Sequence, residues 1–380
     1  MAPSGNYSVG VEEEYFLFDA DTRHAIVHRD EAFTARIAER LGERITTEML
    51  QSQIEAVTPV CVTFDEVRTA LAECRTVLAE EARAFGLGVA AMSTFPLAYW
   101  RGQRATQKER YDAIMDDLQM LGLRNMLCGM HVHVALEDPA RRVLVMQRLV
   151  PYLPVLLALS TSSPFWEGHL TGLHGYRPAA YDELPRTGLP ELLRTQEEYD
   201  ELVGALVSTG IIPDASHIWW SLRPSSRHPT LELRITDVCT RIDDSIAIAA
   251  LYRCLVRAFD RDRSDTLRLN RIGRAITAEN KWRAQRHGVH ADFVDPDRHN
   301  AIGLGAWLEE ILALLRDDID ALACAAPLAR LPEIVSRGAS ADVQMAVYHA
   351  ALSEHGNAAT ALQAVVDWAA EETVRGCADP

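Results

Sequence analysis

Four segments of the chain alternate polar and apolar residues with a period of two, and this pattern constrains the fold more than any other feature. They read VGVEEEYFLF (9–18), QSQIEAVTPV (51–60), GMHVHVAL (129–136) and TLELRITD (230–237). Successive side chains of a β-strand point to opposite faces, so each segment predicts a strand with one polar and one apolar face. Together they predict a sheet that packs one face on a core and keeps the other face polar.

The polar faces of these predicted strands have an unusual composition. They carry Glu, His, Gln and Arg, and lysine is absent from all four segments. Residues two apart share a face, as in three pairs: Glu12 with Glu14, His131 with His133, and Glu232 with Arg234. Glu55 lies on the polar face of the second segment, whereas Glu13 faces away from its two neighbours. Carboxylates that converge on one face are costly to desolvate unless cations compensate them, and oxygen ligands with an imidazole suit Mg²⁺ or Mn²⁺ better than Zn²⁺.

Each of these pairs also has a purely structural explanation. Glu12 and Glu14 fit a solvated edge strand, and Glu232 with Arg234 fits a cross-strand ion pair. A His-x-His pair is more often structural than metal-binding. The coincidence of such pairs on four strands favours a metal site over four independent structural roles.

Three arginines lie on or beside the same segments and extend the chemistry. They are Arg177 in HGYRPA, Arg223 in SLRPSS and Arg234. Guanidinium groups match the oxygen atoms of phosphates and carboxylates, and carboxylate-held metals together with arginines are typical of phosphoryl-transfer sites. The chain contains neither GxxxxGK[ST] nor GxGxxG, so a nucleotide would have to be held mainly by metals and arginines on a sheet.

The overall charge and cysteine content limit the partners and the compartment. The net charge of −16 argues against nucleic acid or an anionic membrane as the main partner. Seven scattered cysteines without a Cys-x-x-Cys pair fit reduced thiols in a cytoplasmic protein. The N-terminal sequence lacks the pattern of a signal peptide, and no uninterrupted apolar run has membrane-spanning length. We therefore expect a cytoplasmic protein that acts on small molecules.

The remaining pattern predicts one α+β domain over residues 1–380, with an antiparallel or mixed sheet and helices gathered on one side. Helices are expected at 64–86, with Asp65 as N-cap, around 106–121, and at 142–160, where two prolines predict a kink. A further strand is expected at 216–224. From about residue 243 the chain is mostly helical, with helices near 243–262, 304–322, 341–354 and 358–374. The apolar surfaces of these helices would permit a homodimer, although core packing uses such surfaces at least as often.

The chain resembles the YbdK-type carboxylate–amine ligases, the second family of glutamate–cysteine ligases. The resemblance rests on six ordered blocks that span residues 7–288: SVGVEEEYFLFD, TTEMLQSQIEAVTPV, CGMHVHVAL, SSPFWEG followed by GYR, LRPS…PTLELRITD, and ENKWRAQRHG. It implies a glutamine-synthetase-like curved antiparallel sheet whose concave face binds Mg·ATP. It also implies a reaction in which ATP phosphorylates a substrate carboxylate and an amine then attacks the acyl phosphate.

The resemblance assigns roles to residues in these blocks. The implied metal ligands, for Mg²⁺ or Mn²⁺, are Glu12, Glu14, Glu55, His131 and Glu232, with Glu48 as a further candidate. Arg234 would contact the transferred phosphate, and Arg177 would hold phosphate or the substrate carboxylate. Arg223, Asn280 and Trp282 would belong to the wall around the nucleotide.

Two positions depart from the family pattern, and two alternative functions stay open. HLTG (169–172) has His169 where the family commonly has Asp, and Ser221 stands where an aspartate usually precedes Leu-Arg-Pro. Both segments are expected to line the substrate pocket, so glutamate and cysteine are only the family default. The alternatives are a metal-dependent hydrolase that uses His131-x-His133, and a catalytically silent relative that senses a nucleotide or metabolite.

Overall fold

The computed structural model describes residues 7–262, 264, 267, 269–295 and 298–377. Residues 1–6, which belong to the N-terminal segment without a signal-peptide pattern, lie outside this range. The strands are β1 (Val9–Asp19), β2 (Ile45–Thr47), β3 (Gln53–Val57), β4 (Leu87–Ala90), β5 (Met130–Ala135), β6 (Phe165–Trp166), β7 (His169–Leu170), β8 (Leu222–Pro224), β9 (Thr230–Leu233), β10 (Asp292–Val294) and β11 (Ala301–Gly303).

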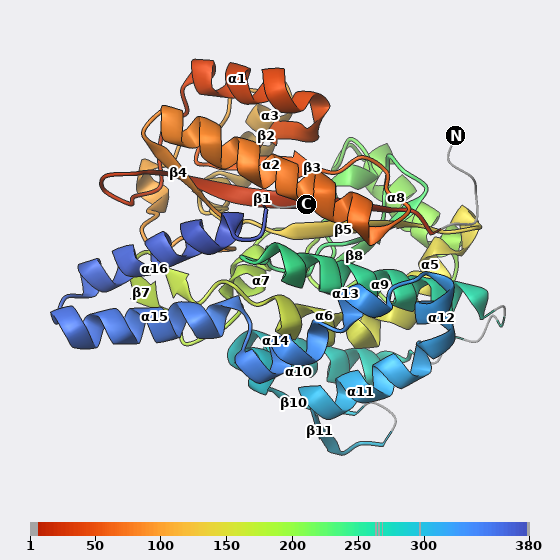
Figure 1. Ribbon diagram of the computed structural model, residues 1–380. Coiled ribbons are helices and arrows are strands. Elements are labelled where there is room, and N and C mark those ends of the chain that lie inside the picture. Colours follow the sequence, from red (N-terminus) through yellow and green to blue (C-terminus); the bar gives the residue numbers. More distant parts are fainter. Residues whose placement is uncertain (1–6, 263, 265–266, 268, 296–297, 378–380) are drawn as a thin grey trace.

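Helices connect and cover these strands (Figure 1). The α-helices are α1 (Glu31–Leu41), α2 (Phe64–Ala84), α3 (Glu109–Leu118), α4 (Met120–Leu123), α5 (Arg142–Leu149), α6 (Leu153–Ser160), α7 (Tyr176–Tyr181), α8 (Gln196–Ser208), α9 (Ile242–Arg261), α10 (Arg271–His287), α11 (Leu304–Leu314), α12 (Arg316–Ala321), α13 (Ala325–Leu328), α14 (Leu331–Arg337), α15 (Ser340–His355) and α16 (Ala358–Val374). Short 3₁₀ turns include η4 (Val150–Tyr152), η5 (Ala215–His217) and η6 (Gly288–His290).

A seven-stranded sheet forms the centre of the fold. Its order is β2-β3-β1-β5-β9-β8, with β4 also paired to β1, and all of its pairings are antiparallel. All four segments with alternating polarity become neighbouring strands β3, β1, β5 and β9. The predicted α+β class with an antiparallel sheet is therefore confirmed.

The two faces of β1 differ as the alternation predicts. Val9, Val11, Glu13 and Tyr15 are buried on the face that α2 and α9 cover, whereas Glu12 on the opposite face is half-buried. Figure 1 shows α2 lying across β1, and α15 and α16 (blue) packing side by side at one end of the molecule. The polar face of the sheet is thereby left to build a site.

The start of α2 corrects one prediction. Thr63, not Asp65, is the N-cap, because its side chain accepts a hydrogen bond from the Glu66 N–H while the Glu66 carboxylate accepts one from the Thr63 N–H. The helix has already begun at Phe64, so Asp65 lies in its first turn. The signal was present in the sequence as Thr-x-x-Glu.

The predicted irregularity at 142–160 is confirmed. α5 continues through the 3₁₀ turn η4 into α6, with one proline in the first turn of each of the last two elements, where a missing N–H is tolerated. The whole stretch Pro139–Ser160 is long and apolar enough to span a membrane by length and composition, although arginines interrupt its apolar run, as the sequence indicates. However, 83% of its most apolar window is buried inside the protein, as in the core helix of a globular fold.

Other boundaries differ from the prediction. Only Leu222–Pro224 of the expected strand 216–224 pairs as a strand, and the segment starts with η5 instead. The helices expected at 106–121 and 304–322 are each divided into two, as α3 with α4 and α11 with α12. The helical C-terminal part begins at Ile242, as expected, and is interrupted by the β10–β11 hairpin.

Candidate active site

The register of the central strands brings the predicted ligands into adjacent rows on one face. Glu14 of β1 pairs with Glu55 of β3, and Glu12 pairs with His131 of β5. One row further, His133 of β5 pairs with Glu232 of β9, which in turn pairs with Arg223 of β8. Residues that are up to 220 positions apart, such as Glu12 and Glu232, thus share one surface.

Within this surface the possible ligand atoms form three overlapping groups, each with its atoms within 4.8 Å of one another. The groups are Glu14 with Glu48 and Glu55, Glu12 with Glu55 and His131, and Glu12 with His133 and Glu232. Glu12 and Glu55 each belong to two groups, so the three candidate cation positions lie side by side. All six predicted ligands are brought together here.

Glu48 joins the site from the loop after β2 rather than from a strand. Its carboxylate accepts a hydrogen bond from the Met49 N–H at 3.2 Å, and its carbonyl accepts one from the Thr106 hydroxyl at 2.6 Å. The Thr106 N–H in turn donates to the Met49 carbonyl. This loop-to-loop attachment holds Glu48 above the strand pair formed by Glu14 and Glu55.

At one end of the site, the carboxylates of Glu14, Glu48 and Glu55 repel one another and disfavour the ionised form. Burial together with the neighbouring carboxylate of Glu48 raises the pKa of Glu14 to about 8. Burial and the charges of Glu12, Glu48 and Glu14 raise the pKa of Glu55 well above its usual range. These shifts show a local excess of negative charge that a divalent cation would relieve.

The two histidines, His131 and His133, offer imidazole nitrogens that could bind a cation. The His131 Nδ1 lies 3.1 Å from Glu12 Oε2, and within the described part of the chain its buried Nε2 has no hydrogen-bond partner. The His133 Nδ1 lies 3.0 Å from the Thr230 hydroxyl, and its Nε2 lies 3.1 Å from Glu12 Oε1. An unpartnered buried imidazole nitrogen beside carboxylates fits a metal ligand, so the residues present fit a divalent cation.

Charge compensation differs at the other end of the site. Burial opposes ionisation of Glu12, but hydrogen bonds from His131 and His133 outweigh it and hold the pKa of Glu12 well below its usual range. The alternation of β5 predicts that His133 shares the polar face with His131, but the predicted ligand set contains only His131 of the two. The signal for its inclusion with the ligands was its place two residues after His131, on the same face of β5.

Glu232 is held by two arginines. Arg223 donates from Nε and Nη2 to the two carboxylate oxygens at 2.9 and 3.0 Å, and Arg234 donates to Oε1 at 2.5 Å. Burial opposes ionisation of Glu232, but Arg234 and Arg223 lower its pKa far below the usual range. Arg223 also donates from Nη1 to the carbonyls of Ser216 and Ile218, so all three of its nitrogens are engaged in positioning.

Arg234 and Arg177 lie together beside the carboxylates. Arg234 donates to the Tyr181 hydroxyl at 3.1 Å, and the Arg177 guanidinium packs over the Tyr181 ring at 5.5 Å from its centre. Within the described residues, the buried Nε atoms of both arginines lack hydrogen-bond partners. A Cβ at Gly129 would lie 2.2 Å from Arg177 Nη2, so glycine is required there for the guanidinium to pass.

Asn280 and Trp282 lie on α10, which packs against α6 and β10. The Asn280 side chain donates to the Val294 carbonyl and accepts from the Val294 N–H, both at 2.8 Å. Its amide is therefore engaged in holding β10, and Trp282 is exposed. Their role in nucleotide binding stays a prediction.

The two departures from the family pattern lie in different surroundings. His169 lines a cleft of about 580 Å³ that is otherwise formed by Tyr99, Arg101, Trp166, Glu167, Thr171 and Tyr176. Ser221 is buried, and its carbonyl accepts hydrogen bonds from the N–H groups of Arg234 and Ile235. Ser221 is thus adjacent to a site arginine, whereas His169 lies at an exposed cleft.

Solved structures share this fold. The chain matches a bifunctional glutathione synthetase from Pasteurella multocida with a TM-score of 0.69 and 16% identity, over 97% of this chain and 53% of that one. The chain thus spans about half the length of that enzyme. It also matches a glutamate–cysteine ligase from Francisella tularensis, solved in complex with AMP, with a TM-score of 0.67 and 12% identity, over 97% and 89% of the two chains.

Closer relatives are found by sequence. Proteins named "Putative glutamate--cysteine ligase 2" are 45% identical in Bradyrhizobium diazoefficiens, over 98% of this chain and 85% of the relative, and 44% identical in Rhodospirillum rubrum, over 97% and 96%. Residues 8–373 match the family model for glutamate-cysteine ligase family 2. The chain therefore belongs to glutamate-cysteine ligase family 2, a family of ATP-dependent carboxylate–amine ligases.

Proposed function

We propose that the protein is a Mg²⁺- or Mn²⁺-dependent ligase that uses ATP to convert an amino-acid carboxylate into an acyl phosphate and couples it to a small amine. The observation that carries this proposal is the set of three overlapping ligand groups on one sheet face, with Arg177 and Arg234 beside them. The names of the relatives support glutamate and cysteine as the default substrates.

The side chains divide the work by their surroundings. Glu12, Glu14, Glu48, Glu55, His131, His133 and Glu232 would hold the divalent cations. Cations held there would supply the positive charge that phosphoryl transfer from ATP requires. Arg234 and Arg177 each keep a buried Nε without a partner and would bind the transferred phosphate or the substrate carboxylate.

Arg223 is proposed to act through Glu232 rather than on the nucleotide. Its bidentate contact fixes the Glu232 carboxylate, and its remaining donors are bound to backbone carbonyls. It thus positions a metal ligand, as partners in the outer shell of metal sites do. The wall around the nucleotide would then come from other residues of the family blocks, with Asn280 and Trp282 as predicted members.

The wider setting follows from the composition. We propose one catalytic domain that works in the cytoplasm. Its substrates would be small molecules, because the net charge of −16 opposes binding to nucleic acid and anionic membranes. A homodimer through the C-terminal helices is also proposed. The altered residues His169 and Ser221 would change the choice of carboxylate or amine while the ATP chemistry is retained.

The test is release of ADP from Mg·ATP across a matrix of amino-acid carboxylates and amines. ADP and amide formed together in one combination would support the proposal and name both substrates. Glu12→Gln and Glu55→Gln should abolish ADP release while the protein stays folded, whereas Glu354→Gln, at an exposed position on α15, should not change it. ADP release without amide, and only with a carboxylate, would indicate an untested amine. No turnover with intact Mg·ATP binding would support a nucleotide sensor instead.

A further inference from the structure

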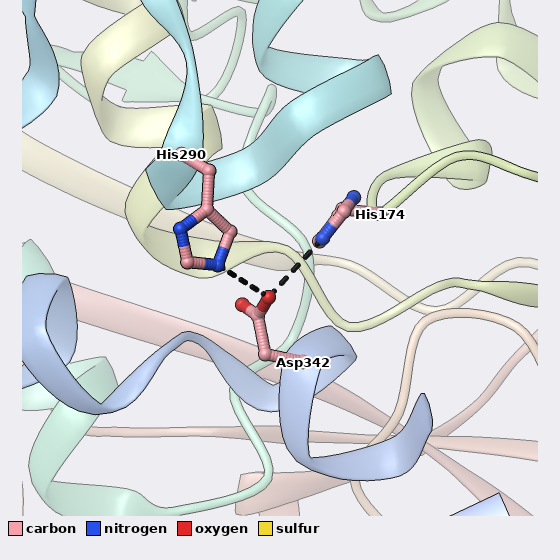
Figure 2. Close-up of side chains that lie close together, drawn as sticks. All are labelled: His174, His290 and Asp342. Atoms are coloured by element: carbon pink, nitrogen blue, oxygen red, sulfur yellow. Dashed lines mark hydrogen bonds and ion pairs between the residues drawn. The ribbon is translucent and has the colours of Figure 1, made fainter. Parts of the chain in front are cut away.

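Two histidines and one aspartate, side chains of types that bind metals, meet outside the candidate active site. His174 lies in the segment between β7 and α7, His290 in η6, and Asp342 in the first turn of α15. The two histidines are 168 and 52 residues from Asp342 in the sequence. Figure 2 shows both imidazole rings pointing at the same carboxylate.

One possible ligand atom from each of the three side chains lies within 4.8 Å of the other two, which is close enough for one metal ion. The Nε2 atoms of His174 and His290 lie 3.1 and 2.9 Å from the same oxygen, Oδ1 of Asp342. Zinc–ligand bonds of about 2.0–2.1 Å in a tetrahedron place neighbouring ligand atoms about 3.3 Å apart. A small adjustment of the side chains would therefore be sufficient to admit a cation.

The hydrogen bonds behind the cluster orient it toward a cation. The His174 Nδ1 lies 3.0 Å from the Arg286 carbonyl, which can only accept, so Nδ1 carries the hydrogen. In the neutral ring Nε2 then presents a lone pair to a carboxylate oxygen, and this contact is repulsive unless a second proton or a metal ion lies between them. A histidine whose other ring nitrogen donates to a backbone carbonyl is a common arrangement at metal sites.

Asp342 is oriented in the same way. Its Oδ2 accepts a hydrogen bond from the Ala339 N–H at 2.9 Å, which leaves Oδ1 directed at the two rings. The side chain of His290 is 65% exposed, whereas those of His174 and Asp342 are 14% and 16% exposed. The cluster is thus supported from within and open to solvent on one side, where a metal and a water ligand could enter.

We propose that His174, His290 and Asp342 form a second metal site, distinct from the carboxylate-rich one, that binds a divalent transition metal such as Zn²⁺. Two imidazoles and one carboxylate suit zinc better than magnesium. The metal would fasten the segment before α7 to η6 and α15, in addition to the hydrogen bonds that the N–H groups of His174 and Gly175 donate to the Gln285 carbonyl of α10. Arg177 lies three residues after His174, so the metal would also help to position Arg177. That effect matters only if the proposed function is correct, whereas metal binding itself does not depend on the proposed function.

The test is titration of the metal-free, full-length protein with Co²⁺, a spectroscopic substitute for Zn²⁺, in the presence of excess Mg²⁺ to occupy the carboxylate site. We expect one equivalent to bind with the visible absorption of a tetrahedral site, and Zn²⁺ to displace it. His290→Ala, at an exposed position, should lower the affinity by at least ~100-fold, more than the loss of an outer-shell partner does. Asp342→Asn should act in the same direction.

Two controls separate this site from other binding. His355→Ala, an exposed histidine near the end of α15, and Glu55→Gln in the candidate active site should both retain the Co²⁺ spectrum. Zn²⁺ should also raise the melting temperature of the wild type but not of His290→Ala. Equal Co²⁺ binding by the wild type and His290→Ala, or none by the wild type, would overturn the proposal and leave a hydrogen-bonded cluster only. None of these measurements depends on ligase activity.

Discussion

The three consecutive glutamates of β1 allow a direct test of the two faces of the sheet. Glu13 and Arg75 are both fully buried and form a bidentate pair at 2.8 and 2.9 Å. The carboxylate of Glu13 also accepts hydrogen bonds from Tyr15 and Ser245, both at 2.5 Å. Glu14, the next residue, faces the candidate active site instead. Glu13→Gln should therefore lower the stability and retain activity, whereas Glu14→Gln should retain the stability and abolish activity.

Glu13→Gln removes one partner of a buried ion pair and leaves the charge of Arg75 without compensation. Arg75 remains fixed by the carbonyls of Thr240, Thr373 and Cys239, so it cannot move to water. Such a loss destabilises a protein by about 3–5 kcal/mol. An unfolding entropy of about 2.1 cal/mol/K per residue gives about 0.8 kcal/mol/K for this chain, so the melting temperature should fall by about 4–6 °C.

Glu14→Gln should leave the melting temperature within about 1 °C of the wild type or raise it, because it removes a charge from a crowded group and can keep the hydrogen bond from the Gly129 N–H. It should abolish ADP release. The measurements are thermal unfolding followed by circular dichroism and a coupled ADP assay below both melting temperatures. A stable, inactive Glu13→Gln variant, or a Glu14→Gln variant that melts several degrees lower, would refute the assignment of the two faces.

Three further predictions follow from single contacts. Burial raises the pKa of Asp237 to about 6, so the folded protein binds a proton at this carboxyl more tightly than the unfolded chain does. Protonation of Asp237 therefore stabilises the fold fully at low pH, and this stabilisation is lost as the pH rises through 6. Asp237→Asn should remove about 1–1.5 kcal/mol of this pH dependence between about pH 5 and about pH 7, as measured by urea unfolding; an unchanged slope would contradict the burial of a titrating carboxyl. Gly129→Ala should displace Arg177 and lower turnover by roughly 10²-fold, whereas Gly10→Ala, where the nearest atom would be 3.9 Å away, should not; equal rates would show that Arg177 is not held by this contact. Thr63→Ala should cost about 1 kcal/mol in denaturant unfolding without changing turnover, and no loss would argue against the cap.

The faces of the central strands, and the candidate ligands that share one of them, can be read from the sequence alone. Alternation with a period of two is a local property of the backbone, so it placed Glu12 and Glu14 on one face and Glu13 on the other before any partner was known. The Thr-x-x-Glu cap of α2 is local in the same sense, although the predicted cap was Asp65 and the observed one is Thr63. Local periodicity therefore sufficed for the sheet and for the character of its polar face.

The partners of these residues, in contrast, depend on how distant segments pack together. Glu13 gains its structural role from Arg75, 62 residues away, and Arg223 is bound to Glu232 because β8 pairs with β9 in that register. The cluster of His174 with Asp342 joins residues 168 apart, for which the sequence has no periodic signal. Contacts between distant segments depend on how the whole chain packs, because side-chain direction is set locally but the neighbouring side chain is supplied by the fold.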